Sequence, residues 1–302
     1  LNLSRVSGLF LAKSKLNRLI KKIQPDLIHT QGLRADSIAA SLKIQTPWIM
    51  TSRNFPPEDY LSKFGLLKGR LMVSQHFSAM KKCNHVVSCS VTIKQKLAKV
   101  GIESSAIQNG VVLPEITEEI IPEFQNYAKP IYISVGSLIP RKNMSLIVNS
   151  FQKMASKNRG TLIILGDGPL MSELKSRSSS DIYLLGDVSN VSEYLSNADF
   201  FVSASLSEGL PNTVLEALAS GLPVILSDID SHKEIASESD SACKIFNLND
   251  GEESLKKAMV AAINEFDSCS RMDARRIATE VFSDEIMSKK YQVLYSNVLE
   301  MR

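Results

Sequence analysis

The stretch of residues 199–230, DFFVSASLSEGLPNTVLEALASGLPVILSDID, decides how the second half of the chain folds. An apolar run at 200–204 is short enough for a buried strand, and a polar turn at 205–212 follows it. The pattern then predicts a helix over about 213–220 and a second buried strand over 223–227. A strand, a loop, a helix and a strand in this order are typical of a parallel α/β sheet. The loop leads into the N-terminus of this helix, where the free backbone N–H groups of the first turn favour binding of an anion.

Two carboxylates stand out in this stretch. Glu208 lies in the loop, and Glu216 follows eight residues later inside the helix, on the polar stripe Asn212–Glu216–Ser220. One interpretation is local: Thr213 and Glu216 fit a capping box, S/T-x-x-E, and Glu208 is a solvated loop acid. The other interpretation is that both glutamates contact a ligand. The residues of this stretch by themselves leave both open.

The whole string S-x-x-E-G-L-P-N-x-x-L-E-A-L-A-x-G-x-P-V-I closely resembles the donor site of retaining glycosyltransferases of family four. These enzymes have the GT-B fold, with two facing Rossmann-like domains. The resemblance implies that Glu208 lies near the donor sugar and that Glu216 holds the ribose of a nucleotide sugar. It also implies that the loop around Gly209, Leu210 and Asn212 faces the diphosphate.

A second loop carries a phosphate signal. The apolar run 131–135 predicts a buried strand, and G-S-L-I-P-R-K-N follows it and leads into a helix. Gly136 allows close backbone approach, and Lys142 can reach a phosphate from the start of the helix. The resembling family has G-R-L-x-x-x-K here, with the arginine and the lysine on the diphosphate. Lys142 matches the lysine, Ser137 takes the place of the arginine, and Arg141 is the candidate substitute.

Two further segments extend the resemblance. The turn G-D-G-P-L, which contains Gly166 and Gly168, resembles the family's loop beneath the nucleotide. The segment 186–189 resembles the one beside the base, which implies that Val188 lies near the ring.

The first half of the chain alternates strand and helix patterns, which predicts an open parallel sheet of about four strands. The segment P-D-L-I-H-T-Q-G-L-R-A-D resembles the acceptor-domain strand of family-four enzymes, where a strand-end histidine lies close to the reacting sugar. His29 matches that position, and Gln31 stands where family members often have a second histidine. His29 is therefore either catalytic or a structural histidine. Arg53 and Asn54 fall where that family has an acceptor-facing loop, which leaves open whether they face the acceptor or the donor.

Domain boundaries follow from composition. Residues 1–113 are predicted to form a partial N-terminal, acceptor-side Rossmann-like domain, and the polar, acidic segment 114–129 is predicted to be a linker. Residues 130–283 are predicted to bind the nucleotide sugar, and a last helix over 284–302 to cross back to the first domain. The family's opening strand and Gly-rich loop do not precede Asp26, so we expect the N-terminal domain to be truncated.

The net charge of +3 is unevenly distributed. Residues 1–110 hold 17 Lys and Arg against 5 Asp and Glu, a net charge of +12, whereas residues 111–302 carry −9. The basic half favours a phosphate-bearing acceptor or an anionic membrane surface, and no recognisable motif points to nucleic acid. Leu16, Leu19, Ile20 and Ile23 predict an amphipathic helix over about 9–24. That helix either covers the sheet or contacts a membrane surface.

The remaining composition excludes several classes. The sequence contains no run of about 18 apolar residues and no signal segment, so we expect a cytoplasmic protein, with peripheral contact at the inner face of the membrane as an open alternative. The four cysteines form no C-x-x-C pair, so no metal is expected, and no G-x-G-x-x-G indicates a nicotinamide cofactor.

The leading interpretation is a retaining, hexosyltransferase-like glycosyltransferase of bacterial polysaccharide type. It would transfer a sugar from a nucleotide-sugar donor to a glycan or lipid-linked acceptor, with Glu208, Lys142 and His29 as the catalytic residues. The donor is a substrate, and no cofactor is expected. Two alternatives stay open: a nucleotide-sugar epimerase of the same fold, and a non-catalytic donor-binding subunit.

Overall fold

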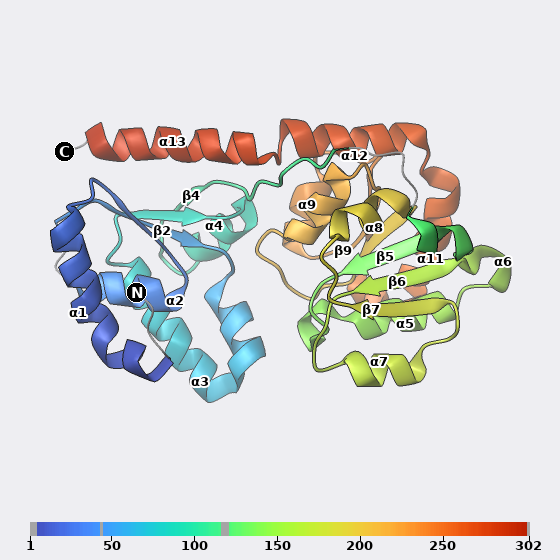
Figure 1. Cartoon of the computed structure of the whole chain (residues 1–302), viewed down its shortest axis with the longest axis horizontal. Helices are drawn as coiled ribbons and strands as arrows, with labels where there is room; N and C mark the ends of the chain where they lie inside the picture. The colour runs from blue at the N-terminus through green and yellow to red at the C-terminus, as the bar shows by residue number, and fades with distance from the viewer. Residues whose placement is uncertain (1–4, 43–44, 116–120, 301–302) are drawn as a thin grey trace. The chain divides into compact units, whose positions relative to one another are not determined.

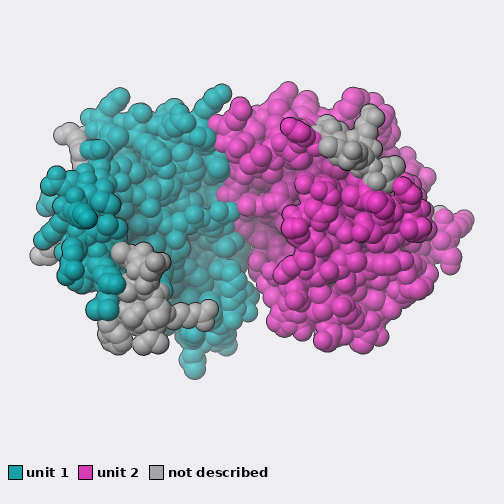
Figure 2. Space-filling view, viewed as in Figure 1, with its two compact units in different colours: residues 1–108, 287–302 teal, residues 109–286 magenta. Residues whose placement is uncertain are grey.

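The computed structural model describes residues 5–42, 45–115 and 121–300 (Figure 1). The chain divides into two compact units, drawn in different colours in Figure 2. Unit 1 consists of Leu1–Gln108 and Met287–Arg302, and unit 2 of Asn109–Ile286. Each unit contains one parallel sheet, as the alternating pattern predicts.

The division falls after Gln108, and the described residues of the segment expected to be a linker, 114–115 and 121–129, fall within unit 2. Residues 116–120 of that segment lie outside the described residues. The segment contains a short 3-10 helix, η1 (Pro122–Asn126), whose Phe124 is buried. The Phe124 ring packs against Tyr194 at 5.7 Å and against Tyr127 at 5.4 Å between ring centroids. Aromatic burial of this kind fixes part of the segment to unit 2.

Unit 1 has four parallel strands in the order in which they occur along the chain. They are β1 (Ile28–Gln31), β2 (Trp48–Ser52), β3 (His85–Ser88) and β4 (Ser105–Ala106). In this register His29 of β1 lies opposite Ile49 of β2. The carboxyl ends of the strands therefore place the residues that follow β1 and β2 along one edge of the sheet.

Helices cover both faces of this sheet. The connections contain α2 (Leu33–Ser41), α3 (Pro56–Met80) and α4 (Val91–Ala98), and α1 (Arg5–Ile23) packs on α2. Figure 1 shows α2 and α3 on one side of the sheet and α13 (Asp284–Glu300) on the other. Tyr291, Leu294 and Val298 of α13 pack on a small core that contains Ile49 and Val87.

Helix α3 begins at Pro56. Pro56 and Pro57 occupy its first positions, where the missing proline N–H costs nothing. Gly65 breaks it into two segments, because its φ of 73° and ψ of −179° are not helical. This conformation favours glycine, since a side chain is strained at such a φ.

Unit 2 has six parallel strands in the order β10-β9-β8-β5-β6-β7. They span β5 (Ile131–Val135), β6 (Thr161–Leu165), β7 (Ile182–Gly186), β8 (Phe200–Ser203), β9 (Val224–Ser227) and β10 (Cys243–Phe246). The chain runs outward from β5 to β7, returns to β8 on the other side of β5, and runs outward again to β10. The strand order thus reverses between β5 and β8, and ligands of open α/β sheets bind at such a point.

Helices cover both faces of this sheet as well. On one side α5 (Met144–Gln152) packs on α11 (Gly251–Glu265), and elsewhere α9 (Asn212–Ala219) packs on α8 (Val191–Asn197) and α12 (Ser268–Glu280). Three shorter helices are α6 (Ser156–Arg159), α7 (Met171–Arg177) and α10 (Asp230–Ala236). Strand β6, TLIIL, is buried at every position, as expected for a strand covered on both faces. The quoted stretch forms β8, α9 and β9, as its pattern predicts.

Candidate active site

Lys142 folds back over the loop that follows β5. It ends a short 3-10 helix, η2 (Pro140–Lys142), and a Cβ built on Gly136 would lie 3.3 Å from its Cε atom. Gly136 also has a φ of 150°. Glycine at this position therefore leaves the room that the lysine side chain occupies at the carboxyl end of β5.

Glu208, in the loop after β8, binds both cations of the β5 loop. Its Oε1 lies 2.7 Å from Nζ of Lys142, and its Oε2 lies 2.7 Å from Nη1 of Arg141. Ser205 Oγ donates a further hydrogen bond to Oε1 at 2.9 Å, and Arg141 Nη1 donates to the Ser207 carbonyl at 2.6 Å. The Glu208 side chain is only 7% exposed. The two loops that meet where the strand order reverses are thus joined by an ion-pair network.

The network of Glu208, Lys142 and Arg141 carries a net positive charge. Burial raises the pKa of the Glu208 carboxyl, but the charges of Lys142 and Arg141 outweigh burial and hold the pKa below its ordinary value. Glu208 therefore stays ionised at neutral pH and does not serve as a proton donor there. One carboxylate between two cations leaves an excess positive charge, which suits an anionic ligand.

Glu216 does not form the capping box that its sequence context permits. Helix α9 begins at Asn212, its N-cap is Pro211, and no side chain caps it. Thr213 consequently lies inside the helix. Within the described part of the chain the Glu216 carboxylate makes no hydrogen bond and no ion pair, although it is half-buried. Burial raises its pKa, partly opposed by the charge of Lys142. The group is an unused acceptor near the cations.

The loop between the two glutamates is fixed by a residue that sequence reasoning missed. Asn109 Nδ2 donates to the Leu210 carbonyl at 2.9 Å and to Asn212 Oδ1 at 3.0 Å. Gly209 and Leu210 are buried, whereas Asn212 is exposed. Asn109 precedes a glycine and therefore resembles an ordinary turn residue, and nothing in the sequence indicates that it contacts this loop 101 positions later.

The remaining predicted donor residues lie along the same edge of the sheet. A Cβ on Gly166 would come within 2.2 Å of the Gly136 carbonyl oxygen, and one on Gly168 within 2.6 Å of the Leu138 carbonyl oxygen. These glycines thus let the loops after β5 and β6 pack together. Ser137 is exposed on that loop. Val188 is half-buried after β7, two strands away from β5.

A buried histidine lies close enough to Glu208 to feel its charge. His232 of α10 is fully buried, shares a 2.9 Å hydrogen bond with Ser227 Oγ and lies 3.4 Å from Ser203 Oγ. Burial lowers its pKa to about 4, so the ring is neutral at pH 7. Sequence reasoning did not select His232, because a single histidine after a strand carries no signal by itself.

His29 is held by both ring nitrogens in unit 1. Nδ1 lies 2.7 Å from Tyr295 Oη, and Nε2 lies 2.7 Å from Thr51 Oγ1, which itself bonds Tyr291 at 2.9 Å. Burial lowers the pKa of the ring, opposed by the charge of Asp36. The histidine connects β1, β2 and α13, and it can reach a substrate only if one of these bonds opens.

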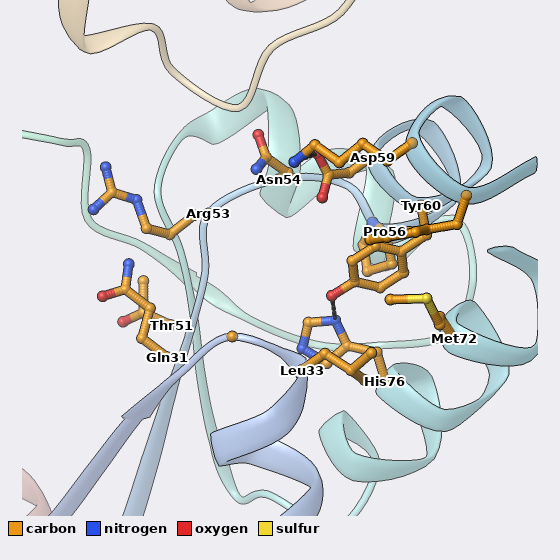
Figure 3. A pocket seen from close by; sticks show the side chains of 13 residues that line it. Gln31, Leu33, Thr51, Arg53, Asn54, Pro56, Asp59, Tyr60, Met72 and His76 are labelled. Atoms are coloured by element: carbon orange, nitrogen blue, oxygen red, sulfur yellow. Dashed lines mark hydrogen bonds and ion pairs between the residues drawn. The ribbon is translucent and has the colours of Figure 1, made fainter. Parts of the chain in front are cut away.

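Unit 1 contains a pocket of about 360 Å³ (Figure 3). Thr51, which bonds His29, is one of its lining residues. On one side Tyr60 Oη shares a 2.9 Å hydrogen bond with His76 Nδ1, and His76 Nε2 lies 2.9 Å from Oδ2 of the fully buried Asp36. On the other side, with its amide oxygen facing Arg53, Gln31 accepts from Nε and Nη1 at 3.2 Å. The remaining lining residues are Gly32, Leu33, Thr51, Asn54, Pro56, Asp59, Lys63, Phe64 and Met72.

Arg53 and Asn54 both line this pocket. The Asp36–His76–Tyr60 chain was not predicted, since its members are 40 and 16 positions apart in sequence. Arg53 makes no ion pair with any carboxylate that the structure describes. The pocket therefore offers a hydroxyl, an amide and an unneutralised guanidinium to a polar ligand.

Two family models match the chain. Residues 129–265 match the one described as "Glycosyl transferases group 1", and residues 2–113 match "Glycosyltransferase Family 4". The chain therefore belongs to the group 1/family 4 glycosyltransferases.

Named relatives agree with this assignment. An alpha-monoglucosyldiacylglycerol synthase of Streptococcus pneumoniae is 28% identical over 237 residues, which are 70% of this chain and 54% of that protein. A UDP-Gal:alpha-D-GlcNAc-diphosphoundecaprenol alpha-1,3-galactosyltransferase of Escherichia coli is 28% identical over 240 residues, 72% of this chain and 61% of that protein. The chain thus spans little more than half the length of these relatives.

The fold has solved counterparts. The sucrose-phosphate synthase of Thermosynechococcus elongatus superposes with a TM-score of 0.84 and 17% identity, covering 99% of this chain and 81% of that one. The two parallel-sheet units therefore have the GT-B fold. Within the described residues, no helix has the length and apolar content needed to cross a membrane.

Proposed function

We propose that this protein transfers a sugar from a nucleotide-sugar donor to a glycan or lipid-linked acceptor, with retention of configuration. The observation that carries the proposal is the ion-pair network of Glu208 with Lys142 and Arg141, together with the Glu216 carboxylate, for which the described residues provide no partner. These groups meet where the strand order of unit 2 reverses, which is the position of ligands in open α/β sheets.

Each group has a role that its chemistry supports. Lys142 and Arg141 neutralise the diphosphate as negative charge develops on the leaving group. Glu216, half-buried and without a partner in the described structure, accepts hydrogen bonds from ribose hydroxyls. Glu208 orients the donor sugar, and the cations on either side keep it ionised.

If transfer proceeds with retention, the state of Glu208 favours direct transfer on one face over a double displacement. Both of its carboxylate oxygens are engaged by cations, so the group is poorly suited to attack the sugar and form a covalent intermediate. In the proposed step the bond between the anomeric carbon and the phosphate oxygen breaks, and the bond to the acceptor oxygen forms on the same face. The acceptor proton goes to an oxygen of the leaving diphosphate.

The acceptor is proposed to enter the pocket of unit 1, near Tyr60 and Arg53. The name of one relative specifies a diphosphoundecaprenol-linked sugar, and that of another a glycosylated diacylglycerol. These names support a lipid-linked or glycan acceptor for this protein. Lys142 and Arg141 supply positive charge at the diphosphate, so we propose that the donor binds without a metal ion.

The test is product formation with the full chain in the presence of a chelator. UDP-, GDP- and ADP-sugars are offered with and without a mixture of polyprenyl-diphosphate-linked sugars, and mass spectrometry follows donor and acceptor. We expect the acceptor to gain one sugar. The Lys142→Gln variant should lose this transfer. The control variant Lys153→Gln, which changes a lysine that pairs with Glu252, should keep it. A donor converted to its epimer without acceptor would contradict the proposal. So would donor binding without turnover at any acceptor.

A further inference from the structure

The outer face of helix α3 exposes large apolar side chains. Leu66, Leu67 and Leu71 are 64%, 89% and 70% exposed. Isolated apolar residues on a surface are ordinary, but three leucines within six residues form a patch. We call the surface formed by Leu66, Leu67, Leu71, Lys68 and Arg70 the α3 face.

The backbone of α3 helps to set the direction of these side chains. Gly65 breaks the helix, and Leu66 and Leu67 follow it directly. A Cβ on Gly69 would lie 2.8 Å from the Tyr60 carbonyl oxygen, so glycine here lets the second segment pack tightly on the first. At about 100° per residue, Leu67 and Leu71 share a side, roughly opposite to the buried His76. The leucines therefore point away from the core of unit 1.

The charge around the α3 face has one sign. From residue 61 to residue 82 the sequence contains five Lys and Arg and no Asp or Glu. Lys68, Arg70, Lys81 and Lys82 make no ion pair with any residue that the structure describes. An adjoining groove of about 680 Å³ has Leu61, Val73 and Phe77 along it, with Arg70, Lys81 and Lys82 at its rim. Apolar and cationic groups thus alternate on one surface.

We propose that the α3 face docks this protein on a bilayer that contains anionic lipids. The leucines enter the boundary between head groups and acyl chains, and the surrounding cations meet lipid phosphates. A second copy of this chain fits less well, because two such faces would bring like charges together. Helix α1, the site that the sequence pattern suggests, has its Ala12 buried and packs on α2.

The opposite side of α3 lines the pocket proposed to take the acceptor, so docking by α3 also affects which acceptor is used. Lys63, Phe64, Met72 and His76 of the same helix line the pocket of unit 1. Docking by the outer face leaves that pocket on the side of α3 away from the lipids, roughly one helix diameter or about 10 Å from them. At that distance we expect the sugar of a lipid-linked acceptor to reach the pocket. This last step rests on the proposed function, whereas the docking itself does not.

Vesicle flotation of the full chain tests the docking. We expect binding to phosphatidylcholine vesicles that contain about 30% phosphatidylglycerol. Because salt screens the attraction between exposed charges, raising NaCl from about 50 to about 500 mM should weaken this binding severalfold. The double variant Leu67→Gln/Leu71→Gln should lower partitioning at least about tenfold, since it removes buried apolar surface. The matched variant Leu11→Gln/Ile23→Gln on α1 should stay within about twofold of the parent.

Three results would overturn the docking. They are equal partitioning onto pure phosphatidylcholine, unchanged binding of the α3 variant, and an α3-dependent dimer on size-exclusion chromatography. Circular dichroism melting confirms that each variant is folded. No donor or acceptor enters the assay, so its failure leaves the proposed transfer standing. Loss of transfer in the product assay, in turn, leaves the docking standing.

Discussion

The Nζ atom of Lys142 lies 2.7 Å from Oε1 of Glu208, across the two loops that follow the neighbouring strands β5 and β8. Arg141 binds the other oxygen of the same carboxylate. Before any ligand enters, the two cations proposed to bind a diphosphate are therefore already paired. A nucleoside diphosphate has to share them with Glu208, and this competition sets the first prediction.

Glu208→Gln should separate affinity from turnover. Removing the carboxylate frees Lys142 and Arg141, so a nucleoside diphosphate should bind about 1 kcal/mol more tightly. Transfer should fall at least about tenfold, because the sugar loses the group that orients it. Calorimetry and product assays measure the two quantities, with Glu252→Gln, which breaks the surface pair with Lys153, as the control. Weaker binding and unchanged transfer would place Glu208 outside the donor site.

Glu216→Gln should stabilise the fold at neutral pH. Burial holds the folded-state pKa of Glu216 above its ordinary value, so the carboxyl favours folding while it is protonated. That contribution is present in acid and is lost as pH rises through the folded-state pKa. The neutral amide should therefore raise the melting temperature at pH 7, with the gain shrinking toward pH 4. The exposed Glu238→Gln should show no such trend, and a parallel trend in both variants would argue against burial as the cause.

His232 should make the folded state sensitive to acid. Its folded-state pKa of about 4 lies below the ordinary value of 6.5, so the unfolded chain binds the proton more readily. Stability is then lost as pH falls from about 6.5 to about 4, by roughly 3 kcal/mol from this group. Denaturant unfolding across that range should give a flatter profile for His232→Gln than for the parent. Equal slopes would mean that His232 does not carry this acid sensitivity.

His29 should be energetically coupled to Tyr295. The hydrogen bond between them joins β1 to α13, so a double-mutant cycle with His29→Ala and Tyr295→Phe should give a coupling of about 0.5–1 kcal/mol in unfolding free energy. The matched cycle uses Tyr60→Phe, since that hydroxyl bonds His76 instead, and should give a coupling near zero. Coupling absent from both cycles would show that His29 is free of Tyr295 in solution.

Local patterns were enough to predict the fold, because a parallel α/β sheet repeats one short unit. Residues 199–230 predict β8, α9 and β9 close to their observed bounds. Local patterns were misleading where a distant contact or a backbone constraint decides the outcome. The capping box at Thr213 is wrong because α9 already begins after Pro211. Within the segment expected to be a linker, the pattern gave no sign that Phe124 packs on Tyr194.

Contacts between loops were beyond the reach of the sequence. The spacing of Glu208 and Glu216 selected both carboxylates, but the pairing of Glu208 with Arg141 and Lys142 joins loops 66 or more residues apart. Asn109 contacts the site loop from 101 positions away, and Asp36, His76 and Tyr60 come together in the same way. A single polar residue that belongs to no spaced motif cannot be assigned to a site from the sequence, because its partners become neighbours only in the folded structure.

Nucleotide binding at Glu216 is the most direct test of the account. Calorimetric titration of the full chain with UDP, GDP and ADP, with chelator present, should show binding of at least one of them. Glu216→Ala and Glu216→Asp should each weaken it by about 1.5–3 kcal/mol, the range for a hydrogen bond to a charged group, while Glu238→Ala leaves it unchanged. If Glu216→Ala binds the nucleotide as well as the parent does, the donor site is not where β5 and β8 meet.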